Sequence, residues 1–194
     1  NDLAKLLRKD IRYVRLTAYR LNKQGLIMQV ERGKYTVHED PFVVATAITT
    51  PSYISFWTAL MLHRLTEQLP STIMVAVPRT RKQVRWNGAV ITFTKLKQFW
   101  GYAKTRYHGS DIFLAEKEKA VIDCLLAKNV PLGEVVKAIG SNELDMAKLL
   151  LYARKTGNKA VMKRIGYLTE HYGKDASELR AGIGANVVPL DLMR

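Results

Sequence analysis

The segment 11–23 carries basic and aromatic side chains that can donate hydrogen bonds to an anionic partner: Arg12, Tyr13, Arg15, Tyr19, Arg20 and Lys23. An apolar stripe at intervals of three and four residues predicts an amphipathic helix here, through Ile11, Val14, Ala18 and Leu21. Early arginines such as Arg12 and Arg15 can make paired hydrogen bonds to guanine, whereas Tyr19 and Lys23 would lie nearer phosphates. Double-stranded DNA is therefore the first partner to consider. The alternative is a surface helix whose basic residues bind nothing.

The residues around this helix predict a small module that presents it. A first helix is expected over 2–9, and Gly25 suits the left-handed end of the second. Strand-like residues at 28–30 and 35–37 flank a turn at 31–34, whose Arg32 and Lys34 could clamp a DNA backbone. Two helices followed by a basic hairpin are typical of a winged helix-turn-helix. The helix that normally precedes these two is not visible in the sequence.

The charge of the chain also favours a polyanionic partner. Among 194 residues, 31 are Lys or Arg and 17 are Asp or Glu, which gives a net charge of +14. No acid occurs from Gln68 to Ser110, although that stretch is rich in cations. We expect its counter-charge to come from outside the molecule. Four of its cations could extend a DNA footprint or engage RNA: Arg79, Arg81, Lys82 and Arg85.

The residues that usually carry catalysis give weak signals. The four histidines are scattered without metal-ligand spacing, His63 fits a hydrogen-bonded position below the surface, and Cys124 fits a small buried hydrophobe. The alternation of Glu116, Lys117, Glu118 and Lys119 after Asp111 leaves a metal-dependent nuclease as an alternative. We predict a protein without enzymatic activity, catalytic residues, metal or cofactor.

The remaining organisation predicts an α+β fold with strands first and helices after. Domains are expected at 1–40, the winged module, and at 52–194, with 41–51 as a linker that includes a helix. The second domain is expected to open with a helix over 52–65. Strands are predicted at 73–77, 89–93, 112–114 and 186–190, and an Asn87-Gly88 turn precedes the second of them. Helices are predicted at 117–127, 132–138, 143–154 and 159–172. Because no signal sequence or membrane-length run occurs, a cytoplasmic location is expected.

Several stretches carry a resemblance to a known family. Ser-Tyr-Ile-Ser-Phe-Trp-Thr-Ala-Leu at 52–60, with Leu-Thr-Glu-Gln-Leu-Pro at 65–70, is similar to the opening of the second domain in AbiEi-type antitoxins of type IV toxin–antitoxin systems. Ala-Glu-Lys-Glu-Lys-Ala-Val-Ile-Asp at 115–123 resembles that family's strand-to-helix signature. Shorter similarities lie at 99–101, 164–168 and 188–191. Arg64 stands where the family usually has a glycine, and Lys117 where it has a proline.

The resemblance implies an autorepressor of a toxin–antitoxin operon that binds inverted repeats in operator DNA through its winged module. It also implies that the second domain acts against a nucleotidyltransferase-like toxin encoded nearby, without a stable complex between the two proteins. The alternatives that remain are an RNA-binding protein or a nuclease that uses the basic second domain.

Overall fold

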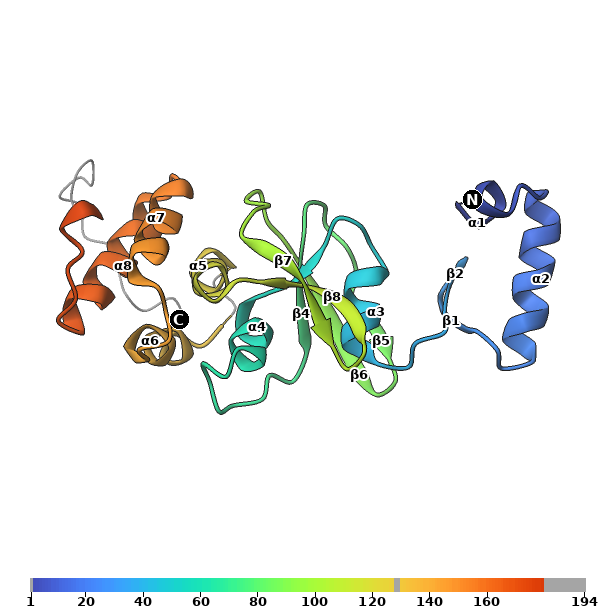
Figure 1. Ribbon diagram of the computed structural model, residues 1–194, viewed down its shortest axis with the longest axis horizontal. Helices are drawn as coiled ribbons and strands as arrows, with labels where there is room; N and C mark the ends of the chain where they lie inside the picture. Colours follow the sequence, from blue (N-terminus) through green and yellow to red (C-terminus); the bar gives the residue numbers. More distant parts are fainter. Residues whose placement is uncertain (1, 128–129, 180–194) are drawn as a thin grey trace.

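The computed structural model describes residues 2–127 and 130–179, in which helices and strands are mixed along an elongated molecule (Figure 1). A small helical and hairpin module occupies one end, a sheet lies in the middle, and a group of helices occupies the other end. Among the described residues, no helix combines the length and the apolar character needed to cross a membrane.

The first module consists of two helices and a hairpin: α1 (Asp2–Leu7), α2 (Ile11–Lys23), β1 (Met28–Glu31) and β2 (Lys34–Thr36). The Asp10 side chain caps α2 by accepting the backbone N–H of Arg12 at 2.7 Å. Gly25 ends the helix with a φ of +74°, as the sequence predicted. The predicted helix over 11–23 and the hairpin that follows it are both confirmed.

The segment expected to link two domains packs into the hydrophobic core. It forms α3 (Pro41–Ala47), in which Val43, Val44 and Ala45 are buried. This helix contacts four strands of the central sheet, β3, β4, β6 and β8. Residues 41–51 thus contribute to the body of the molecule as well as connecting its parts, because their apolar side chains lose contact with water only against the sheet.

The central sheet has six strands in the order β5-β6-β4-β3-β8-β7. The strands are β3 (Tyr53–Ile54), β4 (Ile73–Val77), β5 (Val84–Trp86), β6 (Ala89–Lys95), β7 (Tyr102–Tyr107) and β8 (Ser110–Ala115). The pairs β4–β6 and β3–β8 are parallel, and the other neighbours are antiparallel. The Asn87-Gly88 turn between β5 and β6 is where the sequence predicted it.

Three strands were not expected from the sequence. The helix predicted from residue 52 begins only at Phe56, as α4 (Phe56–Leu62), because residues 53–54 form β3 between β4 and β8. Two residues are too few to show an alternating pattern, so this central strand resembles the start of the following helix in sequence. β5 and β7 are the edge strands. β5 has only three residues, too few for a sustained pattern, and most β7 side chains are exposed and show no apolar alternation.

The helices at the far end agree closely with the predicted ranges. They are α5 (Lys117–Ala127), α6 (Leu132–Gly140), α7 (Met146–Lys155) and α8 (Lys159–His171), followed by the short turn η1 (Ser177–Leu179). α5 contacts α4 as well as α6, α7 and α8, and therefore joins the sheet layer to the helical group. The strand predicted at 186–190 lies outside the described residues.

Candidate nucleic-acid interface

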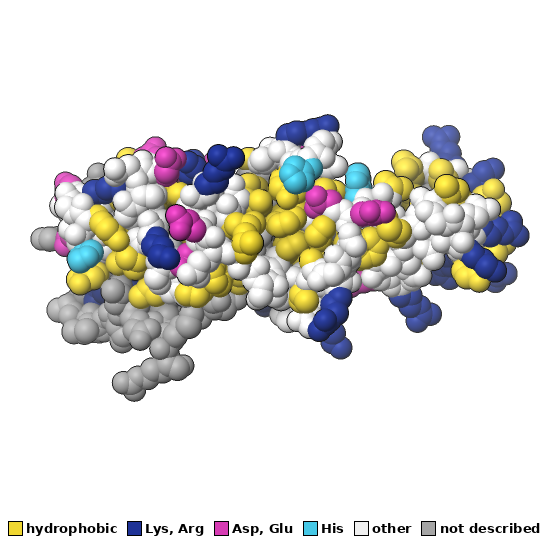
Figure 2. All heavy atoms as spheres, turned by 90° about the horizontal axis from the view of Figure 1, so that it is seen from below, with side chains coloured by type: hydrophobic (Ala, Val, Ile, Leu, Met, Phe, Trp, Pro, Cys, Tyr) yellow, Lys and Arg dark blue, Asp and Glu magenta, His cyan; other side chains and the backbone are white. Residues whose placement is uncertain are grey.

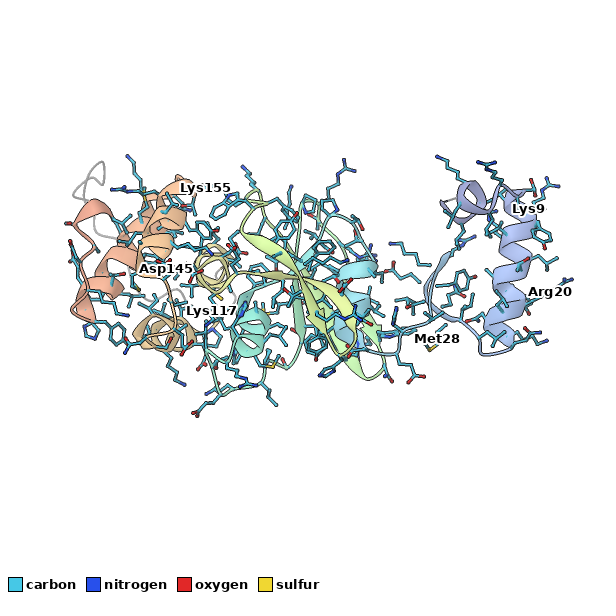
Figure 3. The ribbon with its side chains drawn as sticks, viewed as in Figure 1. Lys9, Arg20, Met28, Lys117, Asp145 and Lys155 are labelled. Atoms are coloured by element: carbon cyan, nitrogen blue, oxygen red, sulfur yellow. The ribbon has the colours of Figure 1, made fainter. Side chains whose placement is uncertain are left out.

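The outward face of α2 is basic and aromatic, as the helical spacing predicted. Val14 and Ala18 are buried, whereas Tyr13 and Tyr19 are 57% and 59% exposed. The cations of this face are also exposed: Arg12, Arg20 and Lys23. Arg20 extends from α2 on the side away from the β1–β2 hairpin (Figure 3). The helix thus presents a row of hydrogen-bond donors to the outside of the molecule.

Internal acids do not neutralise this face. α2 contains no Asp or Glu, and the Asp10 carboxylate is occupied as the helix cap. Within the described part of the chain, no ion pair involves Arg12, Arg20 or Lys23. Figure 2 shows Lys and Arg side chains gathered at this end of the molecule. Such a cluster favours a polyanionic partner because no charge within the face offsets it.

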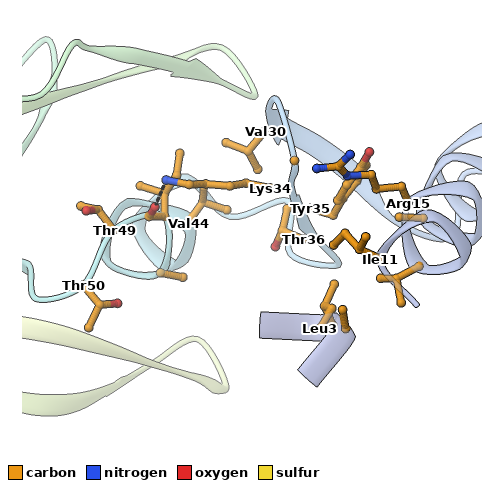
Figure 4. Close-up of a pocket in the computed structure, with 16 residues that line it drawn as sticks. Leu3, Ile11, Arg15, Val30, Lys34, Tyr35, Thr36, Val44, Thr49 and Thr50 are labelled. Carbon is orange, nitrogen blue, oxygen red and sulfur yellow. Dashed lines mark hydrogen bonds between the residues drawn. The ribbon is translucent and has the colours of Figure 1, made fainter. Parts of the chain in front are cut away.

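The hairpin presents fewer cations than the sequence predicted. Arg32 is exposed, but the Lys34 Nζ donates to the Ile48 carbonyl at 2.7 Å and lies 3.4 Å from the Glu31 carboxylate. Lys34 therefore points toward α3 and does not project as a backbone clamp (Figure 4). Arg15 reaches from α2 toward the hairpin and not along the outward face. For Lys34 the difference arises because contacts with other elements, and not spacing along the hairpin, direct the side chain.

The basic segment after β4 also contains both exposed cations and a cation that is paired within the protein. Arg79, Lys82 and Arg85 are exposed, whereas Arg81 pairs with Glu31 of β1 and lies 4.9 Å from the centre of the Phe93 ring. This ion pair places the connection between β4 and β5 beside the hairpin of the first module. The two parts of the chain that carry exposed cations are therefore in direct contact.

The expectation of an external counter-charge for the whole stretch 68–110 was too broad. Lys104 and Arg106 pair with Asp111 at 2.7 and 3.3 Å. Asp111 faces them across the β7–β8 pair, immediately after the acid-free stretch in sequence. Their hydrogen bonds hold the pKa of the Asp111 carboxyl below its usual value. Strand pairing thus brings Asp111, from just outside the acid-free stretch, beside cations within it.

The carboxylates considered for a nuclease are engaged by the protein itself. Glu116 accepts a hydrogen bond from the Tyr152 hydroxyl and pairs with Lys148 at 3.2 Å. Glu118 is buried and accepts the backbone N–H of Asp145 at 3.0 Å. In residues 2–127 and 130–179, no group of three or more His, Cys, Asp or Glu side chains is arranged to hold a metal ion. These partners give both glutamates a structural role at the junction of α5 and α7.

A buried polar network that sequence reasoning missed lies between β3 and α5. The Asp123 carboxylate accepts hydrogen bonds from the Tyr53 and Ser55 hydroxyls at 3.0 and 2.7 Å, and it pairs with Lys119. Lys119 and Asp123 are both fully buried. Desolvation raises the pKa of Asp123 and lowers that of Lys119. The i, i+4 spacing of the pair within an apolar helix was the available signal.

The predictions for His63 and Cys124 are confirmed. The His63 Nε2 lies 2.7 Å from the Ala115 carbonyl, and burial lowers the pKa of this imidazole. Cys124 is buried, and desolvation raises the pKa of its thiol. A buried thiol of raised pKa is a poor nucleophile, so Cys124 serves to fill the core.

A scan of protein-family models and a search of curated proteins found no match to this chain. The basic surface at the α2 end, with its exposed arginines, tyrosines and lysine, is therefore the strongest indication of function in the described residues.

Proposed function

We propose that this chain is a DNA-binding transcriptional regulator whose helix α2 enters the major groove. The observation that supports it is the outward face of α2, where exposed donors lie on a helix free of acids. The proposal takes α1, α2 and the β1–β2 hairpin as a winged helix-turn-helix. A major groove accepts one helix, and arginines on its exposed face can donate to base edges while its flanks meet phosphates.

The roles of individual residues follow from their positions. Arg12 lies in the first turn of α2 and is proposed to contact base edges. Tyr19, Arg20 and Lys23 lie further along the face and are proposed to contact phosphates. Arg32 of the hairpin and the exposed Arg79, Lys82 and Arg85 are proposed to add affinity that carries no sequence information.

We further propose that the regulator is an AbiEi-type antitoxin that represses its own operon in the cytoplasm. The motifs at 52–60 and 115–123 support this assignment. In the structure they come together: Ser55 from the first motif donates a hydrogen bond to Asp123 from the second, at 2.7 Å. Expression of the neighbouring reading frame with and without this protein tests the assignment. Growth arrest that this protein relieves supports it, and a harmless neighbour contradicts it.

DNA binding is tested by fluorescence anisotropy with two labelled duplexes. One spans the DNA immediately upstream of the protein's own reading frame, and the other is a shuffled duplex of the same composition. Arg12→Ala is expected to reduce the preference for the upstream duplex by about tenfold or more, because a base contact contributes about 1–3 kcal/mol of discrimination. Lys23→Ala should weaken both duplexes alike and lower the slope of log affinity against log salt by about one.

Lys159→Ala is the matched control, since it removes an exposed cation from α8 at the other end of the molecule. It is expected to leave affinity, preference and salt slope unchanged. Full discrimination by the Arg12→Ala protein would show that α2 does not read the bases.

A further inference from the structure

A cavity of about 640 Å³ lies where α1, α2 and the hairpin meet α3 (Figure 4). Its apolar wall includes Val14 and Ala18 of α2 and Val44 and Ile48 from α3 and its C-terminal cap. This volume falls within the range of pockets that hold small organic molecules. The cavity is unrelated to the outward face of α2, because it lies on the buried side of that helix.

The charged groups on the wall of the cavity all carry the same sign. Arg15 and Lys34 line it, and no Asp or Glu does. Lys34 is anchored to the Ile48 carbonyl, whereas the Arg15 guanidinium has no ion-pair or hydrogen-bond partner among the described residues. Arg15 also extends toward the hairpin, across the space between the two elements. Hydroxyl groups of Tyr35 and Thr49 supply further polar atoms on the wall.

We infer that this cavity binds a small anionic amphiphile, a molecule with an apolar body and a single carboxylate. Leu3, Ile11 and Val30, which line the cavity and keep part of their side chains exposed, would cover the apolar body. Arg15 would meet the carboxylate in a paired hydrogen bond. An uncharged or cationic molecule of the same shape gains nothing from Arg15. The site is independent of the proposed function, since it requires only the wall of the cavity and not the outward face of α2.

Octanoate, 1-octanol and octylammonium test the inference, since they share one alkyl chain and differ in head group. Binding to the full chain is measured by titration calorimetry and by the methyl resonances of Val14 and Val44. Octanoate is expected to bind at least tenfold more tightly than either analogue and to shift both valine resonances. Equal affinity for octanoate and octylammonium, or no shift at millimolar octanoate, would overturn the proposal.

Two variants and a control locate the site. Arg15→Gln is expected to weaken octanoate binding about tenfold with little change for 1-octanol. Ala47→Phe fills the cavity from α3, at an exposed position that tolerates a larger side chain, and should abolish binding of both. Arg20→Gln removes the same charge from the opposite side of α2 and should change neither. Octanoate binding that survives both Arg15→Gln and Ala47→Phe would contradict this location.

Discussion

Gly25 and Arg64 occupy equivalent positions after two helices. The Gly25 N–H donates to Asn22 and the Leu26 N–H to Leu21, while the Arg64 N–H donates to Met61 and the Leu65 N–H to Leu60. This pattern defines a Schellman motif after α2 and another after α4. Gly25 has a φ of +74° and Arg64 a φ of +60°, a region that disfavours side chains with a Cβ atom.

The two positions predict substitutions of opposite effect. Arg64→Gly is expected to raise the free energy of unfolding by about 1 kcal/mol, because it removes the left-handed strain. Gly25→Ala should lower the free energy of unfolding by about the same amount. No atom lies near a Cβ added at this position, so the cost comes only from the left-handed backbone conformation. Urea unfolding of both variants checks the pair. Two changes of the same sign would contradict the conformational explanation.

The connection between β3 and α5 shows how a buried polar network holds two elements together. Tyr53 and Ser55, in β3 and the residue after it, donate to Asp123 of α5, and the Lys119 ammonium neutralises that carboxylate inside the core. The Lys119 Nζ also lies 4.6 Å from the centre of the Trp100 ring. Each partner depends on the others, because an unpaired charge at this depth is costly.

Lys119→Met is therefore expected to lower the free energy of unfolding by about 3 kcal/mol, since it leaves the Asp123 carboxyl buried without its ion pair. Urea unfolding measures the loss. Lys97→Met makes the same chemical change at an exposed position and should stay within about 0.5 kcal/mol of the parent. Equal stability of the two variants would mean that the buried pair contributes nothing.

At the scale of the whole molecule, Glu31 connects the hairpin to the sheet. Its carboxylate pairs with Arg81 and lies 3.4 Å from the Lys34 Nζ, so one acid holds two of the cations expected to bind DNA. The indole N–H of Trp86 and the side-chain amide of Asn87 both donate to the Glu39 carbonyl between β2 and α3, at 3.1 and 3.2 Å. These contacts hold the hairpin and the connection between β2 and α3 against the sheet.

Glu31→Gln is expected to release Arg81 from its ion pair and to raise affinity for the shuffled duplex several-fold at low salt. The slope of log affinity against log salt should steepen by about one, as a further cation meets phosphate. Glu67→Gln is the matched control, because it removes the same charge from an exposed site between α4 and β4. Equal gains from both substitutions would assign the effect to net charge and not to the released arginine.

Patterns among neighbouring residues in the sequence determined most of the helices and turns of this protein. The period of the apolar residues defined α2, helix start and stop residues separated the helices from α5 to α8, and Gly25 and Asn87-Gly88 marked where the chain turns. These features depend on short-range geometry, which the order of residues expresses directly. The same period placed Arg12 and Lys23 on an exposed face.

Only the tertiary structure decided which charges remain available. Arg81 and Arg85 lie in similar local sequence. Glu31, from a distant strand, pairs with Arg81, whereas Arg85 remains exposed. β3 became a central strand because β4 and β8 supply its hydrogen bonds from both sides. Ion pairs and strand pairings of this kind join residues far apart in the chain, so their partners are set by packing and have no signature in local spacing.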